Sequence, residues 1–262
     1  MLALLPLALL QAAPLPEGNA YVRALVARHR EREEALSRYT FDVAEEEQRL
    51  AKDGAVERRR TRGYQVFHVK GRPIRRQVAE DGVPLEPKRQ AKQDAEAREK
   101  AEAVRSGRAA REEPGVRISA ILDRYDFRSV GREGLDGRPA LVLDFAPLPG
   151  RRDLERDNVL RRLTGRLWVD EADGEVARAE VRNQGAISFG WGVLAKVSSL
   201  AVEMEFRKLE DGVWLPGRVD LELAGRKLLL QSFRRRVLAR YSNYRRFDVE
   251  VDEGPLTPAG PD

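Results

Sequence analysis

The stretch "GRLWVDEADGEVARAEV", residues 165–181, predicts a β-hairpin. Leu167, Trp168 and Val169 precede an acidic turn at Asp173-Gly174, and a second apolar run follows the turn. Asp-Gly between two such runs is a strong hairpin signal, because the favoured tight turn needs a positive φ at both central residues. Side chains alternate along a strand, so Leu167 and Val169 share one face and Trp168 lies on the other. We interpret the hairpin as part of the wall of a larger sheet.

Four more Asp-Gly pairs divide the chain in the same way, at residues 53–54, 81–82, 136–137 and 211–212. The segments around them are predicted to be strands: 39–50, 55–69, 72–80, 137–148, 198–225, 227–233 and 235–247. In the later strands Val202, Met204 and Phe206 alternate with polar residues, which is typical of a sheet with one wet face and one covered face. Together these segments predict an antiparallel meander of about nine to eleven strands.

Three other segments favour helix. Asn19 can cap a helix that runs to about Arg38. Residues 85–113 are rich in helix formers and almost without large apolar side chains, so an exposed charged helix is expected. Residues 115–127 place apolar side chains on one helical face, which must pack on the sheet.

The composition bounds the class of protein. Of the 262 residues 42% are hydrophobic, which suffices for a core, and 35% are charged, which indicates a globular protein with a charged exterior. The net charge of +5 permits binding to nucleic acid or anionic lipid, but acidic residues are interleaved with the basic ones. The absence of cysteine excludes a disulfide framework, a thiol nucleophile, thiolate metal sites and a lipidated cysteine.

The first 18 residues, "MLALLPLALLQAAPLPEG", have the apolar run and the small-residue zone of an export signal, although no positive charge precedes the run. A buried N-terminal segment or a membrane anchor is the alternative. We expect a signal peptide at 1–18, a single domain at 19–250 and a flexible tail at 251–262. No other stretch approaches the roughly 18 apolar residues of a membrane span, so a soluble periplasmic protein is expected.

The sequence offers no convergent catalytic set. The only histidines are His29, in a charged helical stretch, and His68, in the middle of a predicted strand, and no nucleophile, phosphate-loop or dinucleotide motif occurs. Acidic residues 170–173 lack the spacing of a calcium loop and are interpreted as a solvated hairpin tip. Glu45–Glu47 are interpreted as the wet end of a strand. We therefore expect neither an enzyme, a metal site nor a cofactor.

Two surface segments leave alternatives open. Residues 233–247, "FRRRVLARYSNYRRF", interleave aromatic residues with arginine, as single-strand nucleic-acid platforms do. Period two places Tyr241 and Tyr244 on opposite faces, so an edge strand is favoured over contact with lipid headgroups, and no nucleic-acid partner is expected. Residues 185–192, "GAISFGWG", expose Ile187, Phe189 and Trp191 or fold them onto the core; Phe189 and Trp191 are the candidate lid or partner contact.

Three segments carry a family resemblance: "YQVFHVKGRPIRRQVAEDGVPL" at 64–85, "RLWVDEADGEVARAEV" at 166–181 and "GVWLPGRVDLEL" at 212–223. With the order of elements, they resemble the bacterial outer-membrane lipoprotein-sorting superfamily of Lol carriers, and its exported members in particular. The resemblance implies an α+β fold in which a curved antiparallel sheet forms an incomplete β-barrel and helices cover the concave face. It also implies that acyl chains are held between sheet and helices. The charged helix is longer than a carrier needs.

The predicted function is a non-catalytic periplasmic binding or carrier protein for lipoprotein acyl chains or other lipids, in outer-membrane biogenesis. The alternative is an envelope protein-interaction or stress-sensing module that uses the charged helix and the loop at Phe189 and Trp191. A membrane surface or an envelope protein would then be a further partner. The residues predicted to line the acyl site are Leu141, Leu143, Phe145, Leu167, Val169, Val202, Met204, Phe206, Val219 and Leu221.

Overall fold

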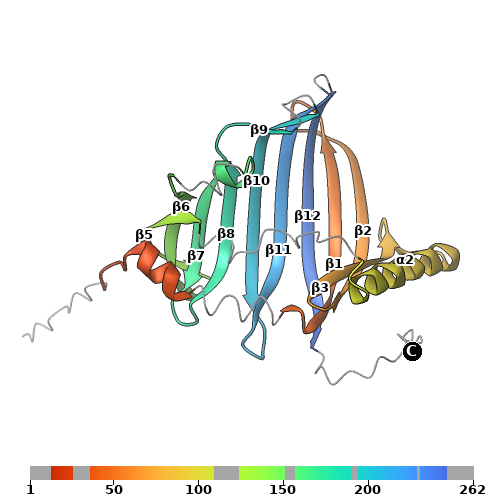
Figure 1. The fold of residues 1–262 in the computed structure, drawn as a ribbon, viewed down its shortest axis with the longest axis horizontal. Helices are drawn as coiled ribbons and strands as arrows, with labels where there is room; N and C mark the ends of the chain where they lie inside the picture. Colours follow the sequence, from red (N-terminus) through yellow and green to blue (C-terminus); the bar gives the residue numbers. More distant parts are fainter. Residues whose placement is uncertain are drawn as a thin grey trace, which may run out of the picture.

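The computed structural model describes residues 13–25, 36–108, 124–150, 157–189, 194–228 and 231–246. They form an α+β fold around one curved, open antiparallel sheet of 12 strands (Figure 1). The strands are β1 (Tyr39–Leu50), β2 (Val56–Val69), β3 (Arg72–Glu80), β4 (Val83–Pro84), β5 (Tyr125–Leu135), β6 (Arg138–Pro147), β7 (Leu163–Asp170), β8 (Glu175–Asn183), β9 (Ile187–Phe189), β10 (Ala195–Lys208), β11 (Trp214–Lys227) and β12 (Gln231–Arg246).

The strand order is β4-β3-β2-β1-β12-β11-β10-β8-β7-β6-β5, with β9 paired to β10 outside this path. The two ends of the order, β4 and β5, are not paired, so the sheet is an incomplete barrel, as the family resemblance implies. β12 lies in the middle of the sheet, between β1 and β11 (Figure 1). The expectation of an edge strand at 233–247 is therefore wrong, because the pairing partner of β12 is a strand almost 200 residues away.

All five Asp-Gly pairs stand between paired strands, as expected. Asp81-Gly82 and Asp136-Gly137 have a positive φ at both residues, which is the geometry that the tight two-residue turn needs. Lys70-Gly71 forms a further turn with a positive φ at both residues, between β2 and β3. At the other three Asp-Gly pairs only the glycine has a positive φ.

Two predicted elements differ from the structure. Tyr125–Leu135 is strand β5, so the helix predicted over 115–127 is wrong at its end, and 115–123 lie outside the described residues. The strand predicted at 227–233 contains a chain reversal, because Lys227 ends β11, Leu228 has φ +46° and Gln231 begins β12.

The N-terminal helix begins at residue 18 and is described to residue 25. Its cap is Glu17, whose carboxylate accepts from the backbone N–H groups of Asn19 at 3.1 Å and Ala20 at 2.6 Å. Asn19, which we expected to be the cap, instead accepts from the backbone N–H of Phe127 at 2.8 Å and so ties the helix to β5.

Helix α2 (Pro87–Arg105) lies against β2 and β3 at one side of the sheet (Figure 1). Most of its large residues are charged, as expected, but Ala97 and Ala101 are buried against Val69 and Ile74. The expectation of a fully exposed helix is therefore wrong, because small side chains let this helix pack closely on the sheet. A short 3-10 helix, η1 (Leu160–Arg162), precedes β7.

The register defines two faces of the sheet. One row of directly paired residues crosses nine strands, from β6 to β3, on a single face: Leu143, Leu167, Ala179, Met204, Val219, Ala239, Glu45, Arg62 and Glu80. We call this the inner face. It is apolar over the first six strands of the row and charged over the last three.

The outer face, which carries the alternate residues, is held by cross-strand ion pairs such as Arg166–Asp144 at 2.7 Å and Arg236–Asp220 at 2.6 Å. The N-terminal helix packs on the inner face, where Val22 and Leu25 join the buried core. α2 packs on the outer face, because Phe67, Val69 and Ile74 alternate with the inner-face residues. The N-terminal helix thus covers part of the inner face, while α2 lies on the outer face.

Candidate functional site

All ten residues predicted to line an acyl site lie on the inner face. Those on β6 and β7 are buried beneath the N-terminal helix, with exposed fractions between 0 and 5%: Leu141, Leu143, Phe145, Leu167 and Val169. Those on β10 and β11 are only partly buried: Val202, Met204, Phe206, Val219 and Leu221. The structure brings the ten together on one surface, with one half covered and the other half partly open.

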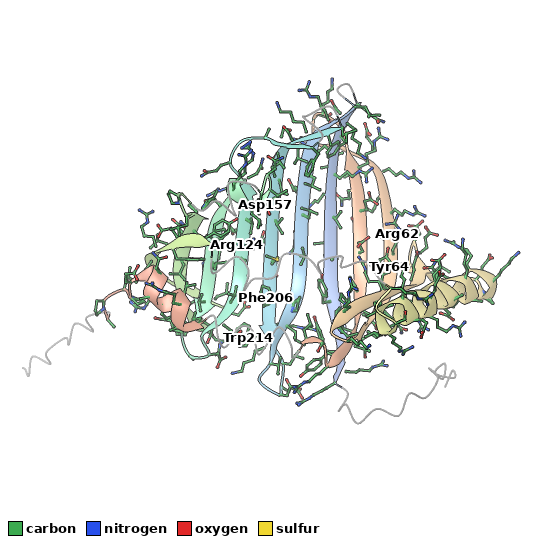
Figure 2. The ribbon with its side chains drawn as sticks, in the orientation of Figure 1. Arg62, Tyr64, Arg124, Asp157, Phe206 and Trp214 are labelled. Carbon is green, nitrogen blue, oxygen red and sulfur yellow. The ribbon has the colours of Figure 1, made fainter. Side chains whose placement is uncertain are left out.

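The partly open half forms a continuous band, which we call the apolar stripe: Leu200, Val202, Met204, Phe206, Val219, Leu221 and Leu223. Its β10 residues pack against the buried core of β5–β8. Val219, on β11, packs against a second core formed by β1, β2, β11 and β12. Figure 2 shows Phe206 on β10, toward the middle of the sheet, with Tyr64 and Arg62 on β2. The stripe therefore joins two buried cores.

Aromatic rings dominate the second core. The ring centroid of Phe41 lies 5.8 Å from that of Tyr241 and 5.2 Å from that of Tyr244. The expectation that the two tyrosines lie on opposite faces is wrong, because a β-bulge with Asn243 at φ +52° shifts the alternation by one residue. The Tyr244 hydroxyl donates to the Pro216 carbonyl at 2.5 Å, and burial raises the pKa of Tyr244.

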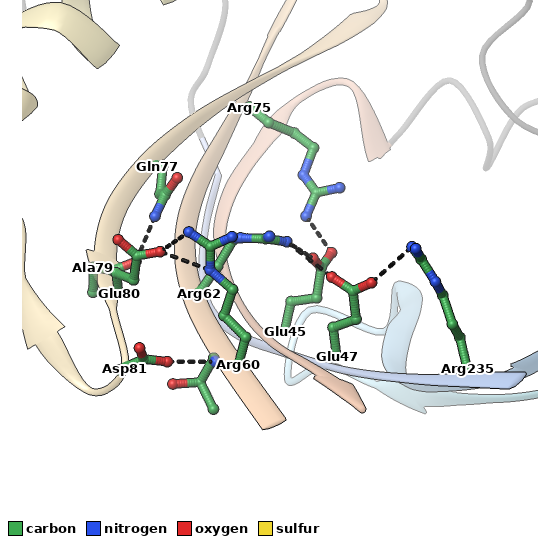
Figure 3. A network of polar contacts seen from close by, with 11 residues as sticks. Glu45, Glu47, Arg60, Arg62, Arg75, Gln77, Ala79, Glu80, Asp81 and Arg235 are labelled. Carbon is green, nitrogen blue, oxygen red and sulfur yellow. Dashed lines mark hydrogen bonds and ion pairs between the residues drawn. The ribbon is translucent and has the colours of Figure 1, made fainter. Parts of the chain in front are cut away.

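The other end of the inner face is a charged network (Figure 3). Arg75 donates to Glu45 at 2.8 Å and Arg235 donates to Glu47 at 3.0 Å, while Arg62 lies 3.5 Å from both carboxylates. The expectation of a wet strand end at Glu45–Glu47 is wrong, because the side chains of these residues are only 16–28% exposed.

Glu80 anchors the edge of this network. Arg89 of α2 donates to one carboxylate oxygen of Glu80 at 2.6 Å, and the guanidinium of Arg60 donates to the other. These hydrogen bonds, first from Arg89 and then from Arg60, hold the pKa of Glu80 below its usual value. Next to the network, a recess of about 160 Å³ is lined by Glu47, Arg49, Arg58, Arg60 and Arg235.

The acidic hairpin tip is structural. Asp170 is 1% exposed and accepts two hydrogen bonds from Arg138, at 2.5 and 2.9 Å. Asp173 accepts from Arg138, Lys208 and the Trp214 indole. The expectation of a solvated tip is therefore wrong for Asp170, because its carboxylate accepts hydrogen bonds from the guanidinium of Arg138, at the start of the neighbouring strand β6. Trp168 packs on the outer face, opposite Leu167 and Val169, as predicted.

The remaining candidate residues are the two histidines and the apolar side chains of the loop at 185–192. The His68 ring contacts the Tyr39 carbonyl at 3.1 Å, and burial lowers its pKa, while His29 and Trp191 lie outside the described residues. Phe189 is 43% exposed, whereas Ile187 is 1% exposed.

The described residues contain no cluster of histidine and carboxylate side chains able to hold a metal ion. None of the helices in this part of the chain combines the length and the apolar composition of a membrane-spanning segment.

No protein-family model matches the chain, and no curated protein matches it. The chain is similar to the solved structure of a domain named for outer membrane lipoprotein sorting, from Vibrio parahaemolyticus, with 11% identity and a TM-score of 0.41 over 90% of this chain and 94% of that one. A LolA superfamily protein from Nitrosomonas europaea has 12% identity and a TM-score of 0.35, over 89% and 95% of the two chains. The MucA/MucB complex of Pseudomonas aeruginosa matches with 15% identity and a TM-score of 0.25, over 83% and 94%. Two of these solved structures, from Vibrio parahaemolyticus and Nitrosomonas europaea, are named for lipoprotein sorting and for the LolA superfamily.

Proposed function

We propose that this chain binds the acyl chains of lipoproteins or other lipids on its inner face, without catalysis, and serves as a carrier or binding protein in the periplasm. The observation that carries the proposal is the apolar stripe of β10 and β11, which remains partly exposed although it adjoins a fully buried core. The ten predicted lining residues keep their ligand-binding role as part of this proposal.

The physical gain comes from removing apolar surface from water. Each CH₂ group of an acyl chain that is buried contributes about 0.8 kcal/mol. The seven side chains of the apolar stripe would lose their remaining contact with water at the same time. Met204 suits such a site, since its thioether is flexible and adapts to chains of different shape. No acid, base or nucleophile is needed for this function.

Two measurements test the proposal. Protein purified without detergent should carry lipid that organic extraction and mass spectrometry detect, and the delipidated protein should bind a fluorescent fatty acid. Leu221→Gln places an amide in the middle of the apolar stripe and should weaken that binding by about tenfold, since a polar group that loses water without a partner costs on the order of 1–3 kcal/mol.

Leu238→Gln is the matched control. Leu238 is partly buried like Leu221 and stands on the neighbouring strand, but it pairs with Asp220 and faces outward. The Leu238→Gln variant should bind the fatty acid as tightly as the unchanged protein does. Equal losses in the two variants, or a delipidated protein that binds no fatty acid, would contradict the proposal.

A second candidate function is an envelope protein-interaction or stress-sensing module, and exposed Phe189 at the end of β9 favours it. Under this function, Phe189→Ser would abolish capture of an envelope protein in a cross-linking experiment and leave fatty-acid binding unchanged. Loss of fatty-acid binding in the same variant would instead assign Phe189 to the lipid site.

A further inference from the structure

Three arginines stand side by side on the inner face. Arg49 of β1 is directly opposite Arg58 of β2 on one side and Arg235 of β12 on the other. Side chains in such positions have Cβ atoms about 5 Å apart, and like charges there destabilise a sheet. We call Arg58, Arg49 and Arg235 the arginine row.

Nearby carboxylates do not balance this row. Arg49 pairs with Glu57 at 3.0 Å, at the open end of the sheet where the Arg49 side chain is 68% exposed. Arg235 shares Glu47 with Arg62. Arg58 has no carboxylate partner within the part of the chain that the structure describes. The row therefore keeps an excess of positive charge on one face.

The row also surrounds a space. The recess of about 160 Å³ is lined by its three arginines together with Arg60 and Glu47. Since roughly 10–15 Å³ on this measure is enough for one water molecule, this volume has room for a group the size of a phosphate and some of its water. Guanidinium groups match phosphate oxygens with paired N–H donors, and several of them converge here from three strands.

The recess adjoins the apolar stripe. Arg235 is directly opposite Leu223, and two residues further along β12 Val237 is opposite Leu221. The change from arginine to aliphatic side chains thus takes two residues, about 7 Å along the strand. A ligand that crosses this boundary has an anionic group at one end and apolar chains at the other.

We infer that the arginine row binds the phosphate group of an anionic lipid whose acyl chains lie on the apolar stripe. This inference rests on the proposed function, since it adds a head-group site to the acyl site. It assigns a chemical class to the ligand, a phosphate-bearing lipid, where the apolar face alone would accept any acyl chain.

The experiment compares two ligands that differ only in the phosphate. Calorimetric titration of the delipidated full chain with dihexanoyl phosphatidic acid and with dihexanoylglycerol should show at least about tenfold tighter binding of phosphatidic acid, the gain typical of charge-assisted hydrogen bonds. We call this difference in affinity the phosphate margin. The double variant Arg58→Gln/Arg235→Gln should lose the phosphate margin and keep its affinity for dihexanoylglycerol.

The matched control is Arg59→Gln/Arg240→Gln. It removes the same charge from the same two strands, but Arg59 pairs with Glu46 on the outer face and Arg240 alternates with Ala239. This control variant should keep the phosphate margin. Circular dichroism melts should show that both double variants are folded. Equal loss in the two double variants, or a margin that survives Arg58→Gln/Arg235→Gln, would overturn the inference.

Three further outcomes separate the two proposals. Binding of both ligands without a margin overturns the head-group site alone. Failure of both ligands to bind overturns the proposed function and the inference with it. Inorganic phosphate, titrated as a third ligand, should bind much more weakly than phosphatidic acid. If inorganic phosphate binds as tightly, the site belongs to a free anion and the lipid assignment is wrong.

Discussion

Asp170 and Arg58 show how differently a charged residue can act in one sheet. Asp170 is buried and fully engaged by Arg138, with its pKa lowered first by the hydrogen bonds from that arginine. Arg58 is exposed and stands beside another arginine without a carboxylate partner in the described structure. The first arrangement stabilises the fold, and the second is costly unless an anion binds.

Asp170→Asn should destabilise the protein by on the order of 2 kcal/mol, because a buried charge-assisted pair is lost and Arg138 is partly solvated. Urea unfolding at pH 7 measures this. Glu171→Gln, at the exposed neighbouring position whose carboxylate pairs with Arg132, should cost less than about 1 kcal/mol. Equal effects would show that burial of Asp170 contributes nothing.

The ion pair of Asp170 and Arg138 also predicts that the stability of the protein depends on pH. The pKa of Asp170 is lowered in the folded state, so its contribution is fully present above the unfolded value of about 3.9 and is lost as the pH falls through the folded value. The difference in stability between the unchanged protein and Asp170→Asn should therefore shrink below about pH 4. A difference that stays constant down to pH 2 would contradict this role.

Arg58→Glu should raise stability by a few tenths of a kcal/mol, because it replaces an arginine pair with an opposite-charge pair. Arg59→Glu, one residue further along the same strand, should lower stability, since it places a carboxylate beside Glu46. Thermal melts at low salt measure both changes, and added salt should reduce both. A loss of stability in Arg58→Glu would mean that the arginine row already has an anionic partner within the protein.

Among the elements, the N-terminal helix is fixed to the sheet by close backbone approach. A Cβ on Gly18 would lie 2.3 Å from the Phe127 carbonyl oxygen and 2.7 Å from its carbon, so Gly18→Ala must push helix and strand apart. Overpacking of this kind costs about 1–3 kcal/mol. We expect that loss in urea unfolding, together with faster release of a bound fatty acid.

Gly134→Ala on β5 is the control for Gly18, because nothing lies within 4 Å of the position where its Cβ would be. Its stability should stay within about 0.5 kcal/mol of the unchanged protein. If Gly18→Ala is equally neutral, the helix does not rest on β5 as closely as the structure has it.

The elements also show what local patterns predict. Period two placed all ten predicted site residues on one face, because side-chain alternation is a property of the strand itself. The docking of α2 could not be predicted, since Ala97 and Ala101 give almost no hydrophobic signal in a charged helix. The bulge at Asn243 could not be predicted either, because a single residue with a positive φ does not change the alternation of apolar and polar residues that precedes it.

At the level of the whole sheet, long-range strand pairing brings together the residues of the proposed site. Local sequence gave no reason to place β12 beside β1, yet this pairing assembles the arginine row from residues 49, 58 and 235. Sequence reasoning therefore predicted the apolar half of the proposed site and did not predict its charged half. The signal that could have found it was the alternation of Glu45, Glu47 and Arg49 in register with Val43, on what proves to be the inner face.

Oxidation of Met204 can report whether a ligand covers the apolar stripe between the two cores. The sequence has two methionines, Met1 and Met204, and Met204 lies partly exposed on the stripe between Ala179 and Val219. Dilute peroxide should oxidise Met204 in delipidated protein, and a bound fatty acid should slow that oxidation, as peptide mass spectrometry would follow. Because the sulfoxide is polar, the oxidised protein should bind fatty acid more weakly, and Met204→Leu should bind normally and resist peroxide. If Met204 of the delipidated protein resists peroxide as well as the lipid-bound form does, the inner face is closed along its whole width and no acyl chain can reach it.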